Sequence, residues 1–273
     1  LIGAREIPAE ALYGVQTLRG IENFSISKFR LSEYPLFIKG LAITKMAAAM
    51  ANFELGLLTV EQKDAIIAAC GEILDGKHHD QFPVDMIQGG AGTTTNMNAN
   101  EVIANRALEL MGHERGEYQY CSPNDHVNCS QSTNDAYPTA IHIGMYFKHL
   151  QLLPHLEELI ASFRKKGEEF SQIIKMGRTQ LEDAVPMTLG QTFNGFASIL
   201  QDEIAHLNEA AADFLVVNMG ATAIGTGICA EPGYAEKCIA ALREITGWDI
   251  RLSSDLVAVS YTHLRAHETS AHL

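Results

Sequence analysis

The sequence predicts a mainly α-helical protein with minor β structure, and three observations support this expectation. Apolar residues recur at steps of three and four in two long stretches, an Ala-rich apolar run precedes them, and no strong strand pattern occurs. We expect an N-terminal α domain over residues 1–134, with its minor β structure in the first 35 residues. Residues 135–259 then predict the start of a long-helix bundle, and residues 260–273 form a tail of different composition.

The first third of the chain supplies two helices after an irregular start. Residues 1–35 show no period and predict an extended, turn-rich arm. Residues 36–57 are apolar and rich in Ala, which favours a helix. Thr59 stands three residues before Gln62, the spacing of a capping box, so a second helix is expected from there through Leu74.

A glycine-rich segment separates these helices from the next one. Residues 89–95 combine Gly and Thr and predict a loop. Residues 100–111 predict a third helix, and Gly112 is placed to end it.

Two long helices are expected after Asp135, where Pro138 suits a first helical turn. The first stretch places apolar residues at Leu152, Leu156, Leu159, Ile160 and Phe163. The second places them at Phe193, Phe196, Leu200, Ile204, Leu207, Ala211 and Phe214. Such stripes pack against other helices at a shallow angle, and two helices joined by residues 171–187 cannot bury both. Residues 215–217 are too short for a predicted strand.

Composition excludes several classes of protein. The net charge of −13 disfavours nucleic acid and an anionic membrane surface as partners. No apolar run approaches the ~20 residues of a membrane helix. The five cysteines show no CxxC spacing and no disulfide framework, so we expect reduced thiols and a cytoplasmic location.

The tail contains three histidines but does not predict a metal site. His263, His267 and His272 could be imagined as ligands, yet Glu268 and His272 are separated by three residues. The zincin pattern needs two residues between the Glu and the second His, because only that spacing puts both imidazoles on one helix face. We therefore expect no metal here, and a metal-binding tail protein is the weakest alternative.

Three turns rich in hydroxyl or amide groups are candidates for binding a carboxylate. They lie at residues 92–96 (Gly-Thr-Thr-Thr-Asn), 130–135 (Ser-Gln-Ser-Thr-Asn-Asp) and 177–180 (Gly-Arg-Thr-Gln). The second precedes the first long helix, whose N-terminus favours an anion. Taken singly, each turn also has a structural explanation as a helix cap or a loop. The glycines of residues 220–227 lack nucleotide-binding spacing.

Long strings around these turns resemble the fumarase/aspartase superfamily. They are residues 3–8 (GAREIP), 14–24 (GVQTLRGIENF), 81–85 (QFPVD), 89–105 (GGAGTTTNMNANEVIAN), 117–139 (EYQYCSPNDHVNCSQSTNDAYPT), 177–190 (GRTQLEDAVPMTLG) and 220–227 (GATAIGTG). The resemblance extends to about residue 259. Within the superfamily, residues 116–120 and Gln180 favour the ammonia-eliminating branch.

The resemblance implies reversible elimination of ammonia from L-aspartate to give fumarate, without a metal or organic cofactor. It implies that substrate is bound by Thr93, Ser132, Thr133, Asn134, Thr179 and Gln180. Asn124 and Asp125 match a secondary anion-binding segment. The resemblance also implies a homotetramer, because sites in this family draw the three turns from different subunits.

One family feature does not occur in these 273 residues. The general base of the family is a serine in a GSSxMPxKxN loop, so no catalytic base is assigned here, and we expect an inactive N-terminal fragment with a foreign tail. The alternative activity is that of a class II fumarase, which interconverts malate and fumarate. Argininosuccinate and adenylosuccinate lyases are more distant alternatives, and a lens-crystallin-like structural role is opposed by the three retained turns.

Overall fold

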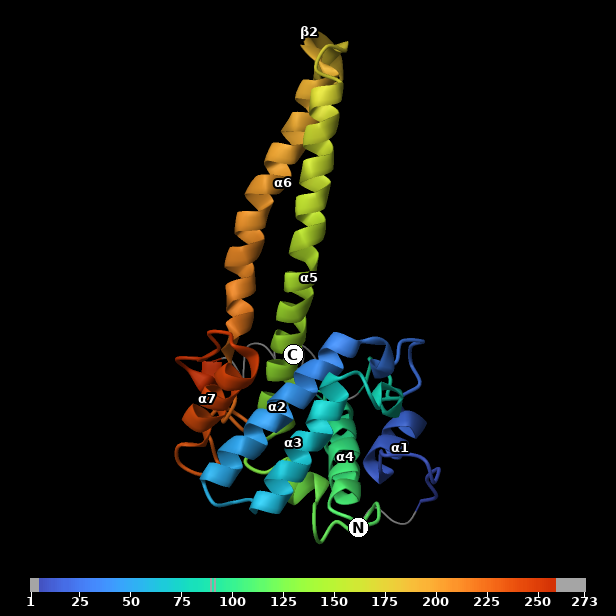
Figure 1. Cartoon of the computed structure of the whole chain (residues 1–273), viewed down its shortest axis with the longest axis vertical. Helices are drawn as coiled ribbons and strands as arrows, with labels where there is room; N and C mark the ends of the chain where they lie inside the picture. The colour runs from blue at the N-terminus through green and yellow to red at the C-terminus, as the bar shows by residue number, and fades with distance from the viewer. Residues whose placement is uncertain (1–4, 89, 91, 259–273) are drawn as a thin grey trace, which may run out of the picture. The chain divides into compact units, whose positions relative to one another are not determined.

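The computed structural model describes residues 5–88, 90 and 92–258, so the predicted tail of residues 260–273 lies outside it. The chain forms two compact units. One contains the chain up to Met145 and the chain from Leu215 onward, and the other contains Tyr146–Phe214. Helices dominate both units, which confirms the mainly α fold class (Figure 1). The domain boundaries after residues 134 and 259 stay a prediction.

The first unit holds most of the elements. In chain order they are α1 (Val15–Asn23), η1 (Leu31–Glu33), α2 (Pro35–Glu54), α3 (Val60–Leu74), η2 (His79–Gln81), α4 (Thr93–Leu110), η3 (Pro123–Val127), the start of α5 (Thr133–Glu169), β3 (Val216–Val217), α7 (Tyr234–Thr246) and β4 (Arg251–Leu252). The second unit contains the rest of α5, then β1 (Ile174–Thr179), β2 (Glu182–Thr188) and α6 (Leu189–Ala211), followed by η4 (Ala212–Leu215) at its end.

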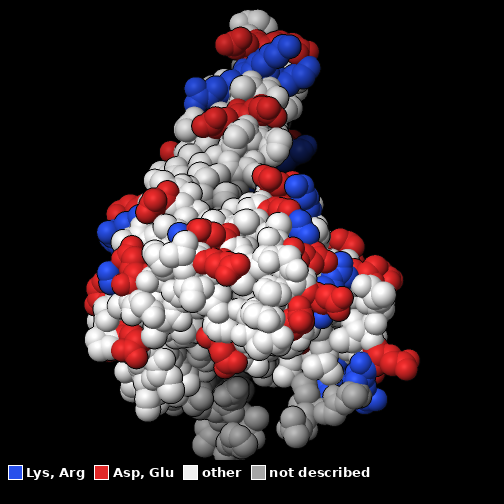
Figure 2. Space-filling model, turned by 60° about the horizontal axis from the view of Figure 1, so that its bottom comes forward, with Lys and Arg blue, Asp and Glu red and all other residues white. Residues whose placement is uncertain are grey.

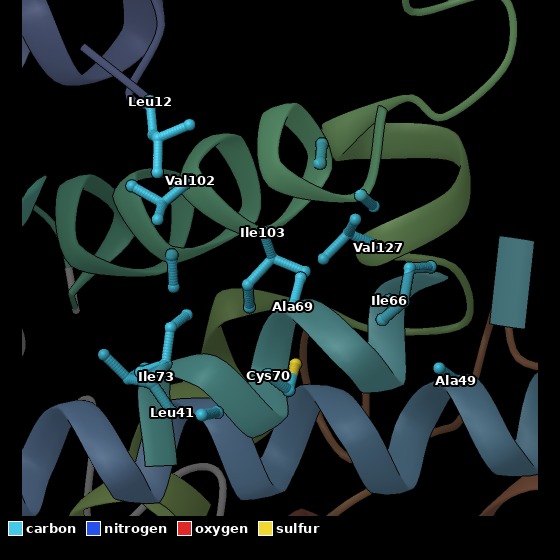
Figure 3. Close-up of a cluster of buried hydrophobic side chains, with 14 of the residues drawn as sticks. Leu12, Leu41, Ala49, Ile66, Ala69, Cys70, Ile73, Val102, Ile103 and Val127 are labelled. Carbon is cyan, nitrogen blue, oxygen red and sulfur yellow. The ribbon is translucent and has the colours of Figure 1, made fainter. Parts of the chain in front are cut away.

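Helices α2, α3 and α4 build the apolar core of the first unit (Figure 3). Helix α3 turns Ile66 and Ile73, seven residues apart, into this core, where they meet Leu41 of α2 and Ile103 of α4. This spacing is the helical period that the sequence shows. The Thr59 hydroxyl accepts the Gln62 backbone N–H at 3.2 Å, which confirms the predicted start of α3.

Helix α2 crosses the beginning of α5 at very short range. A Cβ on Gly40 would overlap the carbonyl oxygen of Ala140, and a Cβ on Gly144 would lie 3.2 Å from the Leu36 carbonyl oxygen. Only glycine lets two backbones approach this closely. The crossing holds the first turns of α5 against α2, next to the candidate site described below.

Helix α2 also corrects an expectation about apolar runs. By length and composition it passes the test for a membrane-spanning helix, and it is the one helix among the described residues that does. Most of that stretch is buried inside the first unit, including Lys45 and Asn52. Core helices pass the same test, so the feature is weak support for a membrane span.

The irregular arm predicted for residues 1–35 was wrong in part, because Val15–Asn23 form α1. The Glu101 side chain of α4 accepts backbone N–H groups from Gly14 at 2.8 Å, Gln16 at 2.8 Å and Thr17 at 3.0 Å. These are the unpaired donors at the start of a helix. Their acceptor lies more than 80 residues away in the sequence, so this cap is not visible in the local pattern.

The β structure lies elsewhere than the sequence suggested. Within the described part of residues 1–35, the only β feature is an isolated bridge between Arg30 and Asp85. Strands β1 and β2 form an antiparallel hairpin in the connection at 171–187, and β3 pairs in parallel with β4. The dismissal of Val216–Val217 as a strand was therefore wrong, since its partner is distant in sequence. The hairpin turn contains Gln180 and Leu181 at positive φ. Gly or Asn normally occupies such turn positions, so these two residues did not mark the turn in the sequence.

In the second unit, α5 and α6 contact each other through the apolar stripes predicted from the sequence (Figure 1). The Phe163 ring lies 6.0 Å from the ring of Phe193 and 5.7 Å from that of Phe196. Leu152 and Leu159 of the first stripe and Phe196 of the second stay exposed, and Ile199, outside the stripes, is 62 % exposed. The pair does not bury its own stripes.

Charged side chains of both signs are interspersed on the face shown in Figure 2. An ion-pair chain in the first unit runs from Glu72 through Arg106 and Glu109 to Arg115.

Candidate functional site

The first predicted turn is the N-terminus of a helix, and not a loop followed by a later helix. Helix α4 begins at Thr93, so the expectation of a loop up to residue 95 and a helix from residue 100 was wrong. Gly92 caps it with φ at 87°, and a Cβ there would overlap the ring of Tyr137 in α5. Glycine is therefore required, and Thr93 is left exposed in the first turn, where the helix dipole favours an anion.

The second predicted turn also leads into a helix, as expected. Helix α5 begins at Thr133, and the Ser132 backbone N–H donates to the Asp135 Oδ1 atom at 2.9 Å. The Asn134 N–H donates to the Ser132 Oγ at 3.3 Å. The Asn96 Nδ2 donates to the Thr133 Oγ1 at 3.1 Å. Both hydroxyls thus accept a bond from the protein, which leaves their own hydrogens for another acceptor.

Two contacts bring the N-terminal turns of α4 and α5 together within the first unit. They are the Gly92 packing against Tyr137 and the hydrogen bond from Asn96 to Thr133. The first turns of α4 and α5 therefore lie side by side, and hydroxyl groups and unpaired backbone N–H groups of both turns lie near one another. Such donors suit a carboxylate.

Asn134 is tied to the segment that follows β3. Its Nδ2 donates to the Ala223 carbonyl oxygen at 2.6 Å, which leaves its second N–H for another acceptor. The Asn134 carbonyl accepts the Asn218 Nδ2 at 3.1 Å. Pro138 lies in the second turn of α5, not the first as expected, and its missing N–H frees that carbonyl.

Asp135 connects the second turn to the glycine-rich segment. Its Oδ2 accepts the backbone N–H groups of Gly220 at 3.2 Å and Thr222 at 2.9 Å. Burial raises the pKa of this carboxyl to about 6, against the opposing effect of its hydrogen bonds from the Ser132 and Thr222 backbones and of the Lys45 charge. Asp135 therefore binds the glycine-rich segment of residues 220–227 through its backbone N–H groups.

Lys45 lies beneath the second turn and was missed by the sequence analysis. Its Nζ donates to the Asn128 Oδ1 at 3.0 Å and to the Gln131 Oε1 at 2.8 Å. Burial lowers the pKa of this amine to about 7, although Asp135 acts in the opposite direction. The available signal was a lysine in the middle of an apolar, Ala-rich helix, where a charge is costly without partners.

The other predicted residues fall outside this cluster. Thr179 ends β1 and Gln180 forms the hairpin turn, and both are exposed in the second unit, so convergence of all three turns stays a prediction. Asn124 and Asp125 are exposed in η3, where the Ser122 Oγ donates to the Asp125 Oδ2 at 2.8 Å. Their anion-binding role also stays a prediction.

Among the residues that the structure describes, no group of three or more His, Cys, Asp or Glu side chains could hold a metal ion. The donors around the two helix N-termini are hydroxyls, amides and backbone N–H groups. This set suits a carboxylate better than a divalent cation.

A family model described as lyase matches residues 3–269, so the chain belongs to the lyase family. It is 55 % identical to the aspartate ammonia-lyase of Pseudomonas canavaninivorans and 53 % identical to that of Escherichia coli strain K12. Each alignment covers 94 % of this chain and 54 % of the relative. The chain therefore spans about half the length of these curated relatives.

Solved structures with this fold carry related names. A structure called fumarate lyase:delta crystallin from Brucella melitensis, bound to cobalt, is 52 % identical with a TM-score of 0.93, covering 95 % of this chain and 56 % of that one. A class II fumarase from Schistosoma mansoni is 34 % identical with a TM-score of 0.84, covering 93 % and 56 %.

Proposed function

We propose that this chain is the N-terminal half of a longer enzyme that reversibly eliminates ammonia from L-aspartate to give fumarate. That longer protein is called the full-length enzyme below. The meeting of the α4 and α5 N-termini, with free hydroxyl hydrogens on Ser132 and Thr133, supports this proposal most directly. The names of relatives at 53–55 % identity support the choice of aspartate.

The reaction explains why neutral donors are needed. A proton leaves the carbon beside the β-carboxylate, and the transition state resembles a carboxylate carrying an additional negative charge. Preorganised donors stabilise such a charge more in the transition state than in bound substrate. In our proposal Thr93, Ser132, Thr133 and Asn134 supply these donors.

The remaining roles belong to groups outside this cluster. Thr179 and Gln180 are proposed to contact the rest of the substrate, and the amide of Gln180 can donate to a carboxylate but cannot titrate as an acid or base. The general base is proposed to be the serine of a GSSxMPxKxN loop, which does not occur in these 273 residues.

The first test is the reaction itself. Full-length enzyme given L-aspartate is expected to release fumarate, followed by ultraviolet absorbance, and given fumarate it is expected to form aspartate only with ammonium. The 273-residue chain alone is expected to produce no fumarate, since the proposed base is missing from it. Malate formed from fumarate without ammonium would favour the fumarase alternative. Robust turnover by the 273-residue chain would contradict the assignment of the base.

The exposed apolar side chains of the second unit support a proposed homotetramer. Ile199 lies in α6 with 62 % of its surface exposed, and burying such a side chain between subunits would contribute about 1.5–3 kcal/mol. Ile199→Glu in the full-length enzyme is therefore expected to lower the mass measured by light scattering below four chains. The adjacent exposed Ser198, changed to Glu, adds the same charge and is expected to preserve the tetramer. An active monomeric wild-type enzyme would refute this proposal.

A cytoplasmic location is likewise our proposal. All five cysteines are free, and Cys70, Cys121 and Cys238 are buried. Unpaired thiols are typical of a reducing compartment.

A further inference from the structure

The buried amides under the second turn form a chain of hydrogen bonds that ends on a proposed substrate-binding hydroxyl. The Lys45 Nζ donates to the Asn128 Oδ1, which also accepts the Asn96 Nδ2 at 3.1 Å. That same Asn96 Nδ2 donates to the Thr133 Oγ1 at 3.1 Å. Lys45 and Asn96 are almost fully buried, so water does not compete for these bonds.

The orientation of each amide in this chain is fixed by its neighbours. A lysine nitrogen donates to both of its partners here, so the oxygen of Asn128 faces Lys45. The backbone gives an independent restraint, because the Asn128 Nδ2 donates to the Gln131 carbonyl oxygen at 3.3 Å. Oxygen and nitrogen of Asn128 are therefore assigned from two sides.

The assignment of Asn128 determines that of Asn96. If Asn96 turned its oxygen toward the Asn128 Oδ1, two acceptors would face each other in a buried site, which is unfavourable. The Asn96 Nδ2 therefore points to both Asn128 and Thr133. The Asn96 Oδ1 has no partner among the described residues, so the hydrogen bonds of this side chain all run through its nitrogen.

The direction of the Thr133 hydroxyl hydrogen follows from the bond that this hydroxyl accepts from Asn96. Because the Thr133 Oγ1 accepts from Asn96, its hydrogen cannot point toward Asn96 and is left for an acceptor on another side. We propose that Asn96, held by Asn128 and Lys45, is a positioning residue that fixes the Thr133 hydroxyl as a hydrogen-bond donor to the substrate carboxylate. This inference rests on the proposed function, which places Thr133 at that carboxylate.

The test is a double-mutant cycle in the full-length enzyme with L-aspartate as substrate. Asn96→Ala is expected to lower kcat/KM by about 10- to 100-fold through lost positioning, with most of the loss in kcat. Thr133→Val removes the donor and is expected to lower kcat by about 100- to 1,000-fold. Asn96→Ala added to Thr133→Val is expected to cost no more than about threefold further, because residues acting through one group are not additive.

Asn100 provides a matched control from the same helix. Its Nδ2 also donates to the Asn128 Oδ1 at 3.1 Å, and its side chain is equally buried, but no hydrogen bond to Thr133 is present. Asn100→Ala therefore removes a comparable buried bond without touching the hydroxyl. Its kcat/KM is expected to stay within about threefold of wild type. If Asn96→Ala fails to fold, Asn96→Asp keeps the volume, and its carboxylate oxygen accepts the Thr133 hydrogen, with at least the same expected loss.

The outcomes separate this inference from the proposed function. An equal loss from Asn96→Ala in both backgrounds, or an Asn100→Ala loss as large as that of Asn96→Ala, would overturn the positioning role while the lyase reaction stands. If wild-type full-length enzyme does not convert L-aspartate, the proposed function fails and the inference fails with it.

Discussion

Thr93→Val in the full-length enzyme is expected to lower kcat by about 100- to 1,000-fold, the usual effect of removing one transition-state donor. Valine keeps the size and shape of threonine, so the change removes only the hydroxyl. Thr93 is exposed in the first turn of α4, and its hydroxyl makes no hydrogen bond to any residue that the structure describes. Steady-state kinetics with L-aspartate, giving kcat and KM separately, is the measurement.

The next residue supplies the control for this experiment. Thr94 packs its γ-methyl group against Gly20, where a Cβ would overlap it, and valine keeps that methyl group. Thr94→Val is expected to leave kcat within about twofold, as is usual for substitutions away from a site. An unchanged kcat in Thr93→Val would remove Thr93 from the site.

Glu101→Gln is expected to detach α1 locally from the first unit. The carboxylate accepts three backbone N–H groups and the Thr17 hydroxyl at 2.7 Å, while an amide would turn an NH₂ group toward these donors. With the NH₂ group in place of Oε1, the bond from Gln16 is lost and the other three bonds no longer reach a charged group, which together costs roughly 3 kcal/mol or more. Amide hydrogen exchange in Val15–Asn23 is therefore expected to become about 100-fold faster. Mass spectrometry of the exchanged full-length enzyme measures this rate.

Glu61→Gln is the control, because it also replaces a carboxylate by an amide but at an exposed residue without the contacts of Glu101. Glu61 lies exposed in the first turn of α3, so Glu61→Gln alters the charge at a helix N-terminus and little else. Exchange in α3 is expected to change by about threefold or less, since an exposed charge there contributes about 0.3–1 kcal/mol. Equal protection of α1 in wild type and Glu101→Gln would show that the carboxylate does not hold this helix.

The sequence is informative where structure depends on neighbours in the chain. The helix after Thr59 is marked by its capping box, and the long helices by their apolar stripes, and both were found. The cap of helix α1 and the pairing of strand β3 were not visible, because their partners, Glu101 and Arg251–Leu252, are distant in sequence. Local rules carry no information about such partners.

The residues of the candidate site also fall into two groups, those indicated by a continuous stretch of sequence and those defined by contacts between distant segments. Ser132, Thr133 and Asn134 could be assigned from a resemblance carried by one uninterrupted string, and the structure puts them at the predicted helix start. Lys45 was missed, and Asn96 was expected only as part of the first turn, because their hydrogen bonds join α2 and α4 to residues 128–133. A lysine in an apolar helix signals a buried partner but not its identity.

The first unit is assembled from two separate stretches of chain, and this has a consequence for its synthesis. Helix α7 packs on α2 although the whole of the second unit is translated between them. At about 5–20 residues per second, a ribosome needs roughly 10–40 s to make residues 55–233, which separate α2 from α7. During this interval the face of α2 that α7 later covers stays open on the nascent polypeptide, where chaperones would have their clearest opportunity to bind.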